Sequence, residues 1–181
     1  MQEIIAKTKK IIFSPKEFFK DLNEPKIKDA FVFAAFWSLV RAVLAFLISI
    51  PIASVFGKSL SYPQVVLGFI AELIIGFVAA FLLYLWLRLF GGKGNYLKTY
   101  QLYVYSNTPN MLLGWLPIIS IIAGIYGLYI LIVGTREIHK IGNKKSILIY
   151  LIPMIVIVIL LLVGTIFAFS SLYKFGFPRL R

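Results

Sequence analysis

Two ionisable residues, Arg41 and Glu72, lie deep inside long apolar runs of the sequence. An unpaired charge at the centre of a bilayer costs about 2.5–3.5 kcal/mol on insertion scales, so each residue needs a partner. At about 1.5 Å per helical residue, both lie roughly 16 Å from the same side of a hydrocarbon core about 30 Å thick. We therefore predict an Arg41–Glu72 ion pair. Such a pair either fixes how two helices dock or forms a polar site on a transport or proton path.

Small residues share a helix face with each member of the predicted pair. Those beside the arginine are Ala34, Ser38, Ala45 and Ser49, and those beside the glutamate are Gly68, Gly76 and Ala80. Because small residues let membrane helices approach closely, these two faces are predicted to meet.

The third apolar run, residues 99–116, is unusually polar and contains a proline. Pro109 has no backbone N–H, which predicts that the carbonyl of Tyr105 lacks its helical donor. Irregular backbone at membrane depth is tolerated where it is buried in protein or lines a cavity. We expect Tyr105, Asn107, Pro109 and Asn110 to face Arg41 and Glu72 as one intramembrane polar site. The alternative is a kinked helix whose own side chains satisfy the break.

Several kinds of chemistry have no support in the sequence. The chain contains no cysteine and one histidine, His139, so a metal site rich in these ligands is not expected. Gly91–Asn95 is glycine-rich but lacks the residues that a phosphate-binding loop needs after its lysine, and a flexible turn is the favoured interpretation. No arrangement of nucleophile, base and acid is evident. We predict a protein that is not an enzyme and uses no cofactor.

Five apolar runs set the fold class. The chain is 60% hydrophobic and 14% charged, whereas a soluble domain has about 25% charged residues. A span needs roughly 20 apolar residues, which most of the runs approach or exceed. We predict an all-α, polytopic membrane protein built as a five-helix bundle. The runs are 30–56, 63–90, 99–116, 117–135 and 146–170.

The distribution of lysine and arginine predicts the orientation. Residues 1–29, 88–98 and 136–145 hold fourteen of these residues, whereas the alternate connections and the tail hold four. Cytoplasmic loops carry the excess, so the N-terminus is predicted to be cytoplasmic and the C-terminus outside. Reading the third and fourth runs as one very long span would give four crossings and would oppose this count.

We predict that residues 1–29 form a cytoplasmic amphipathic N-terminal segment, followed by the membrane domain over 30–170 and a basic outside tail over 171–181. Ser14-Pro15-Lys16-Glu17 matches a capping box with proline at the first helical position, which predicts a short helix. The segment is interpreted as helices on the membrane surface, and the alternative is a solvated tail. Phe18 and Phe19 favour the surface helix because they need an apolar environment.

Three stretches resemble the Yip-domain family of Ypt/Rab-interacting membrane proteins over roughly residues 10–170. They are Phe13–Phe19, then Phe90–Gly94 with Tyr105–Pro109, then Gly114–Pro117 with Gly134–His139. The resemblance implies five spans and a cytoplasmic N-terminus. In eukaryotes the family binds prenylated Rab GTPases. This chain lacks the aspartate-leucine-tyrosine-glycine-proline motif of that branch and resembles prokaryotic members, so a Rab-type partner is not expected and the cell membrane is the expected location.

Two classes of function fit these features. The first is a non-enzymatic membrane protein that organises or shapes the bilayer or recruits partners, with membrane lipids, copies of itself or other membrane proteins as partners and no nucleic acid. The second is a small transporter or channel that uses Arg41, Glu72 and the broken third span. The amphipathic segment favours the first class, and the intramembrane charges favour the second.

Overall fold

A computed structural model describes the protein at residues 1–55 and 62–175. Every regular element in these ranges is a helix, which agrees with the predicted all-α class. The chain divides into two units, Met1–Gly142 and Asn143–Arg181, and each is described by itself. Most of the predicted first loop, residues 57–61, and residues 176–181 of the predicted outside tail lie outside the described residues.

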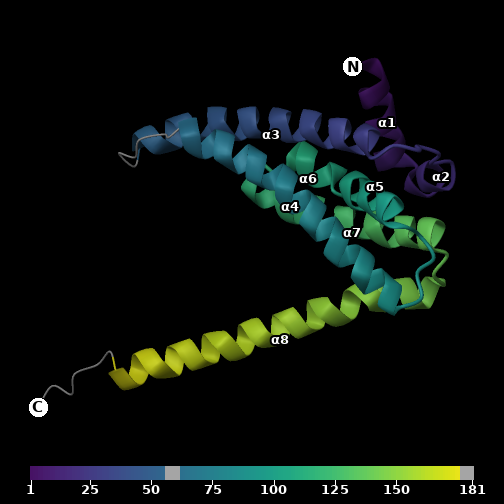
Figure 1. The fold of residues 1–181 in the computed structure, drawn as a ribbon. Helices are drawn as coiled ribbons and strands as arrows, with labels where there is room; N and C mark the ends of the chain where they lie inside the picture. The colour runs from purple at the N-terminus through teal and green to yellow at the C-terminus, as the bar shows by residue number, and fades with distance from the viewer. Residues whose placement is uncertain (56–61, 176–181) are drawn as a thin grey trace, which may run out of the picture. The chain divides into compact units, whose positions relative to one another are not determined.

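Among the described residues, the first unit contains the helices α1 to α7 and the second unit contains α8 (Asn143–Phe175), which Figure 1 labels. Those of the first unit are α1 (Gln2–Phe13), α2 (Pro15–Lys20), α3 (Ile27–Val55), α4 (Tyr62–Leu89), α5 (Tyr96–Ser106), α6 (Thr108–Leu113) and α7 (Pro117–His139).

Four helices of the described residues are long and apolar enough to cross a membrane. Their candidate spans are Ile27–Pro51, Pro63–Leu89, Ile118–His139 and Asn143–Ser170. The predicted third span is instead two short helices, α5 and α6, which meet at Asn107. Judged by helix length, the described residues therefore contain four candidate spans, whereas the apolar runs predict five.

Helix α5 lies at the centre of the first unit although it is one of the less apolar helices. It packs against α3, α4 and α7 (Figure 1). Tyr100, Gln101 and Tyr105 are almost completely buried within it. Asn95 begins the helix, because its side-chain oxygen accepts a hydrogen bond of 2.9 Å from the N–H of Lys98. The protein thus covers its polar, interrupted segment with the apolar helices around it.

Two hydrogen bonds place three polar connections at one end of the first unit. The N–H of Lys93 donates to the carbonyl of His139 over 3.1 Å. The ammonium of Lys98 donates to the carbonyl of Leu22 over 3.0 Å. The chain therefore reverses direction between α6 and α7. This rules out the alternative in which the third and fourth runs form one long helix.

The N-terminal helices pack on the bundle. Pro15 begins α2 with Ser14 as its N-cap, as predicted, but the Ser14 side chain makes no capping hydrogen bond, so the capping box does not form. Phe18 and Phe19 are 6% and 3% exposed. Phe18 packs edge-on against the ring of Tyr105, and α2 packs against α7. The phenylalanines find their apolar environment inside the protein and not in the bilayer.

Candidate functional site

The predicted ion pair between Arg41 and Glu72 is confirmed and joins α3 to α4. The guanidinium donates to one carboxylate oxygen. The hydroxyl of Ser38 donates to the other over 3.1 Å. Both oxygens of Glu72 are thereby satisfied. This arrangement is what a carboxylate inside an apolar bundle requires.

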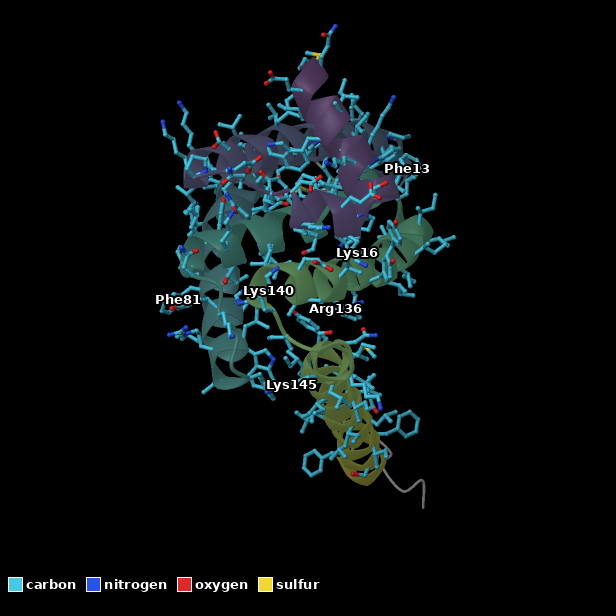
Figure 2. The ribbon with its side chains drawn as sticks, turned by 90° about the vertical axis from the view of Figure 1, so that its right-hand side faces the viewer. Phe13, Lys16, Phe81, Arg136, Lys140 and Lys145 are labelled. Atoms are coloured by element: carbon cyan, nitrogen blue, oxygen red, sulfur yellow. The ribbon has the colours of Figure 1, made fainter. Side chains whose placement is uncertain are left out.

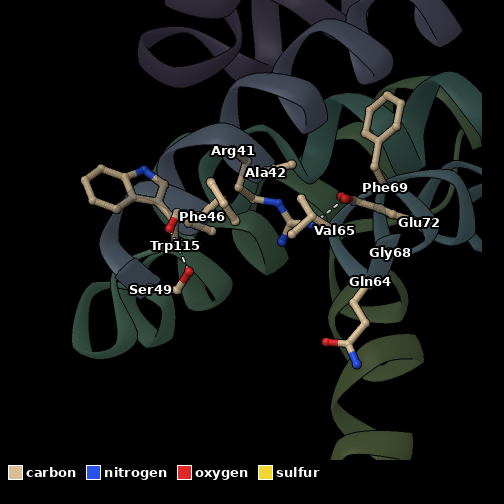
Figure 3. A pocket seen from close by; sticks show the side chains of 12 residues that line it. Arg41, Ala42, Phe46, Ser49, Gln64, Val65, Gly68, Phe69, Glu72 and Trp115 are labelled. Atoms are coloured by element: carbon tan, nitrogen blue, oxygen red, sulfur yellow. Dashed lines mark hydrogen bonds and ion pairs between the residues drawn. The ribbon is translucent and has the colours of Figure 1, made fainter. Parts of the chain in front are cut away.

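The pair lies in a groove of about 410 Å³ between α3 and α4 (Figure 3). The side chains of Arg41 and Glu72 line this groove and are 34% and 26% exposed. Gln64, Ser49 and Trp115 also line this groove. It combines a charge pair with apolar walls, so it can hold a polar group that enters from the bilayer.

The faces that carry the small residues meet at the ion pair, as predicted, but two of their glycines make no close contact between α3 and α4. A Cβ at Gly68 would meet no atom within 4 Å. A Cβ at Gly76 would lie 3.7 Å from the ring of Tyr103, which belongs to α5. The faces of α3 and α4 that carry small residues thus border the groove and leave room for α5. The predicted close α3–α4 contact at these glycines is wrong.

The break between α5 and α6 is satisfied by the protein's own groups. The hydroxyl of Thr108 donates to the carbonyl of Tyr105 over 2.7 Å. This bond supplies the donor that Pro109 lacks. The side-chain amide of Asn110 donates to the side-chain oxygen of Asn107 over 3.0 Å. The prediction of an unpaired Tyr105 carbonyl is therefore wrong, and the kinked-helix alternative describes the backbone at this point.

Helix α7 packs closely over this break at two glycines. A Cβ at Gly127 would lie 3.0 Å from the carbonyl oxygen of Ser106, and one at Gly124 would lie 3.8 Å from the side-chain oxygen of Asn110. Asn110 therefore lies toward α7. The absence of side chains at these positions lets the interrupted helix stay buried.

The six predicted site residues do not form one site. Asn107 and Glu72 line a common cavity of about 20 Å³, together with Tyr100 and Tyr103. A cavity of this size holds about one water molecule when polar groups surround it. Tyr105 belongs elsewhere, because its hydroxyl donates to Glu24. Its ring packs edge-on against Phe33 with centroids 5.2 Å apart.

Glu24 is the centre of a polar cluster that sequence reasoning missed. Its carboxylate accepts hydrogen bonds from the ammonium of Lys7 and from the hydroxyl of Tyr105. Its backbone carbonyl accepts a bond of 2.9 Å from the side-chain amide of Gln101. These contacts tie α1 and the segment between α2 and α3 to α5. A signal exists in the sequence: Gln101 and Tyr105 are four residues apart, so they share one helix face and both need partners.

Two further bonds hold α1 against the bundle. The indole N–H of Trp37 donates to the hydroxyl of Thr8 over 3.0 Å. The hydroxyl of Tyr126 donates to the carbonyl of Ile12. An exposed ion pair joins Lys10 to Asp21 at 2.9 Å, and the Lys10 ammonium lowers the pKa of the Asp21 carboxyl. Helices α1 and α2 thus belong to the folded unit.

The glycine-rich loop is fixed by His139 and is not the flexible turn that the sequence predicts. The N–H of Gly94 donates to Nδ1 of the buried imidazole over 3.2 Å. Nε2 lies 3.1 Å from the Thr99 hydroxyl, which itself donates to the Asn95 carbonyl, so Nε2 carries the proton. A Cβ at Gly92 or Gly94 would lie within 3.0 Å of the imidazole. The Gly94 N–H is therefore occupied and unavailable to a phosphate.

Within the ranges that the structure describes, no group of three or more histidine, cysteine, aspartate or glutamate side chains could hold a metal ion.

A family model described as the Yip1 domain matches residues 9–165, close to the range of the resemblance seen in the sequence. No curated protein and no solved structure matches the chain.

Proposed function

Because the chain belongs to the Yip1 domain family, we propose that it is a non-enzymatic integral membrane protein that organises or shapes the bilayer or recruits partners to it. The family and the four long apolar helices of the described residues support a multi-pass membrane protein.

The proposal includes five crossings, with the N-terminus in the cytoplasm and the C-terminus outside. Helices α5 and α6 make the third crossing together. Hydrogen bonds join Lys93 to His139 and Lys98 to Leu22 at one end of the first unit. This supports the arrangement, because the lysine-rich connections then lie on the same side of the membrane. We place the protein in the cell membrane of a prokaryote, on the resemblance to the prokaryotic branch.

One observation carries the proposal, and it is the attachment of α1 and α2 to the bundle. Their outward faces remain amphipathic: Phe13 is 80% exposed, and Lys9 and Lys16 are exposed beside it. Figure 2 shows Phe13 and Lys16 on these helices and Arg136 and Lys140 at the end of α7. An amphipathic helix inserted at one interface adds area to one leaflet only. Because the bundle holds these helices in place, the added area is permanent.

Vesicle geometry tests this function. The purified chain in vesicles rich in anionic lipid should decrease the vesicle radius, or form tubules, as the protein-to-lipid ratio rises. Phe13→Ser should weaken the effect, because the exposed ring would no longer enter the leaflet. Leu89→Ser is the matched control, since Leu89 is 79% exposed and lies outside α1 and α2. Unchanged vesicle size with the wild-type protein would contradict the proposal.

A second candidate function is a small transporter or channel, favoured by the groove at Arg41 and Glu72 and by the cavity that Glu72 shares with Asn107. Flux into proteoliposomes distinguishes the two. Flux that disappears in Glu72→Gln would favour transport over shaping.

Membrane lipids are the partners that we propose first, followed by copies of the chain or other membrane proteins. We propose no nucleic-acid partner and no Rab-type GTPase.

A further inference from the structure

A second cavity lies between α1 and the first turns of α3. Its volume is about 520 Å³, within the range of about 300–1,000 Å³ that small-molecule sites occupy. It shares no lining residue with the Arg41–Glu72 groove. It is therefore a separate place where a ligand can bind.

One wall of this cavity is fixed. Lys7 and Glu24 line it and form an ion pair with each other. Phe33 also lines it and packs against the ring of Tyr105, whose hydroxyl donates to the same Glu24. The groups of this wall already have partners, so the cavity has a defined shape before a ligand arrives.

The remaining charges face the ligand. Glu3, Lys28 and Asp29 line the cavity and are exposed. None of them takes part in an ion pair among residues 1–55 and 62–175. A ligand that satisfies these side chains needs an anionic group for the lysine and a cationic group for the two carboxylates.

The position of the cavity indicates where such a ligand comes from. The first candidate span begins at Ile27, so Lys28 and Asp29 lie in its first turn, at the depth of the lipid headgroups. Ile4 and Val32 add an apolar wall, and Val32 is 45% exposed. A molecule with a charged head and an apolar tail can reach this place from the bilayer.

We propose that this cavity binds the headgroup of a phospholipid that carries a primary amine, with its phosphate at Lys28 and its ammonium at Glu3 and Asp29. A primary ammonium has three N–H donors for the carboxylates, whereas a choline headgroup has none. A glycerol headgroup with only negative charge is repelled by the two carboxylates. The site does not depend on membrane shaping, so either proposal can fail without the other.

Ligand-induced thermal stabilisation of the purified full chain tests the site. The probes are phosphatidylethanolamine, phosphatidylcholine and phosphatidylglycerol with identical acyl chains, added to the protein in a neutral detergent. We expect the ethanolamine lipid to bind about tenfold more tightly than the other two, the effect of one or two charge-assisted hydrogen bonds. Equal stabilisation by all three lipids would overturn the proposal.

Substitutions of the lining residues test which side chains produce the preference for the ethanolamine headgroup. The double change Glu3→Gln/Asp29→Asn should abolish the preference for ethanolamine over choline, and Lys28→Gln should weaken binding of both lipids alike. Glu17→Gln, an exposed acidic residue on α2 outside the cavity, is the matched control and should keep the preference. If Glu17→Gln removes it, or if Glu3→Gln/Asp29→Asn retains it, the assignment is wrong. Should a variant fail to fold, the comparison of three lipids on the wild-type chain still decides.

A headgroup without acyl chains tests whether the ligand comes from the bilayer or from solution. Water-soluble glycerophosphoethanolamine should stabilise the wild-type chain far less than the lipid, because it lacks the tail that contacts the apolar wall. Equal stabilisation by the two would contradict a lipid site.

Discussion

The hydroxyl of Tyr105 donates a hydrogen bond to the carboxylate of Glu24, across 81 residues of chain. This bond joins the central helix α5 to the segment that connects α2 with α3. Because Glu24 also pairs with Lys7 of α1, the same carboxylate attaches α1 and the segment after α2 to the core.

Removing the Tyr105 hydroxyl should loosen the N-terminal helices. Tyr105→Phe keeps the ring contacts with Phe18 and Phe33 but leaves Glu24 one donor short, which should lower the free energy of unfolding by about 1–3 kcal/mol. Denaturation in mixed micelles measures this change, and faster proteolysis within residues 1–26 should accompany it. Lys10→Ala, which breaks the exposed pair with Asp21, is the control and should change neither quantity measurably. A Tyr105→Phe variant with wild-type stability would show that the bond does not hold the segment.

The ion pair between Arg41 and Glu72 should behave as a coupled unit. Arg41→Met or Glu72→Met alone leaves one charge without its partner and should destabilise the bundle by about 3 kcal/mol. This is the lower end of the range for buried pairs, because the pair borders a groove. Replacing both residues by methionine should cost less than the sum. Additive effects in this double-mutant cycle would mean that the two residues are not partners.

The break at Pro109 offers a rescue experiment. Thr108→Val removes the hydroxyl that donates to the Tyr105 carbonyl, at an expected cost of about 1–3 kcal/mol for an unsatisfied buried acceptor. Adding Pro109→Ala restores a backbone N–H four residues after Tyr105 and should recover much of this loss. The free energies of unfolding of the two single variants and the double variant provide the test. No recovery in Thr108→Val/Pro109→Ala would show that the carbonyl does not depend on this donor.

The loop around Gly94 should depend on His139. A Cβ at Gly94 would lie 2.7 Å from the imidazole, so Gly94→Ala should displace the loop and increase labelling of a cysteine introduced at Lys93. His139→Ala combined with Gly94→Ala removes the clash and should be less destabilised than the two single effects predict. Gly68→Ala is the control, because a Cβ there meets nothing within 4 Å. Unchanged labelling in Gly94→Ala would contradict the close packing.

Orientation can be measured on a background without cysteine. Single cysteines at positions 20, 95 and 142 should be labelled from the cytoplasm, because positive charge collects in these connections. Positions 59 and 176 should be labelled from outside, and both lie outside the described residues. Labelling of position 142 from outside would overturn the five-crossing arrangement.

Individual residues explain how far the sequence predicts this fold. The sequence predicts the Arg41–Glu72 pair because few other charges lie so deep in the apolar runs. Each of the two residues therefore has few possible partners. The positions of α3, α4 and α7 follow from the length of their apolar runs. The turn before Pro117 follows from the missing N–H of that residue.

The residues that the sequence did not predict depend on long-range contacts. Glu24 lies in an irregular segment and is one of many charges before the first span, yet its partners Lys7 and Tyr105 come from two different helices. The missing N–H of Pro109 predicts an unpaired Tyr105 carbonyl, but the choice between Thr108 and a ligand as its donor depends on a side-chain rotamer. The Tyr105 hydroxyl bonds to Glu24 and so helps to hold the N-terminal segment.

The vesicle radius produced by a protein with loosened N-terminal helices tests whether their attachment to the bundle shapes the bilayer. Glu24→Gln/Tyr105→Phe removes the ion pair with Lys7 and the bond to the hydroxyl while leaving the exposed faces of α1 and α2 unchanged. Electron microscopy at matched protein-to-lipid ratios should show small vesicles or tubules with the wild-type chain and larger vesicles with this variant. Equal radii with the wild-type chain and this variant would contradict the claim that firmly attached N-terminal helices shape the bilayer.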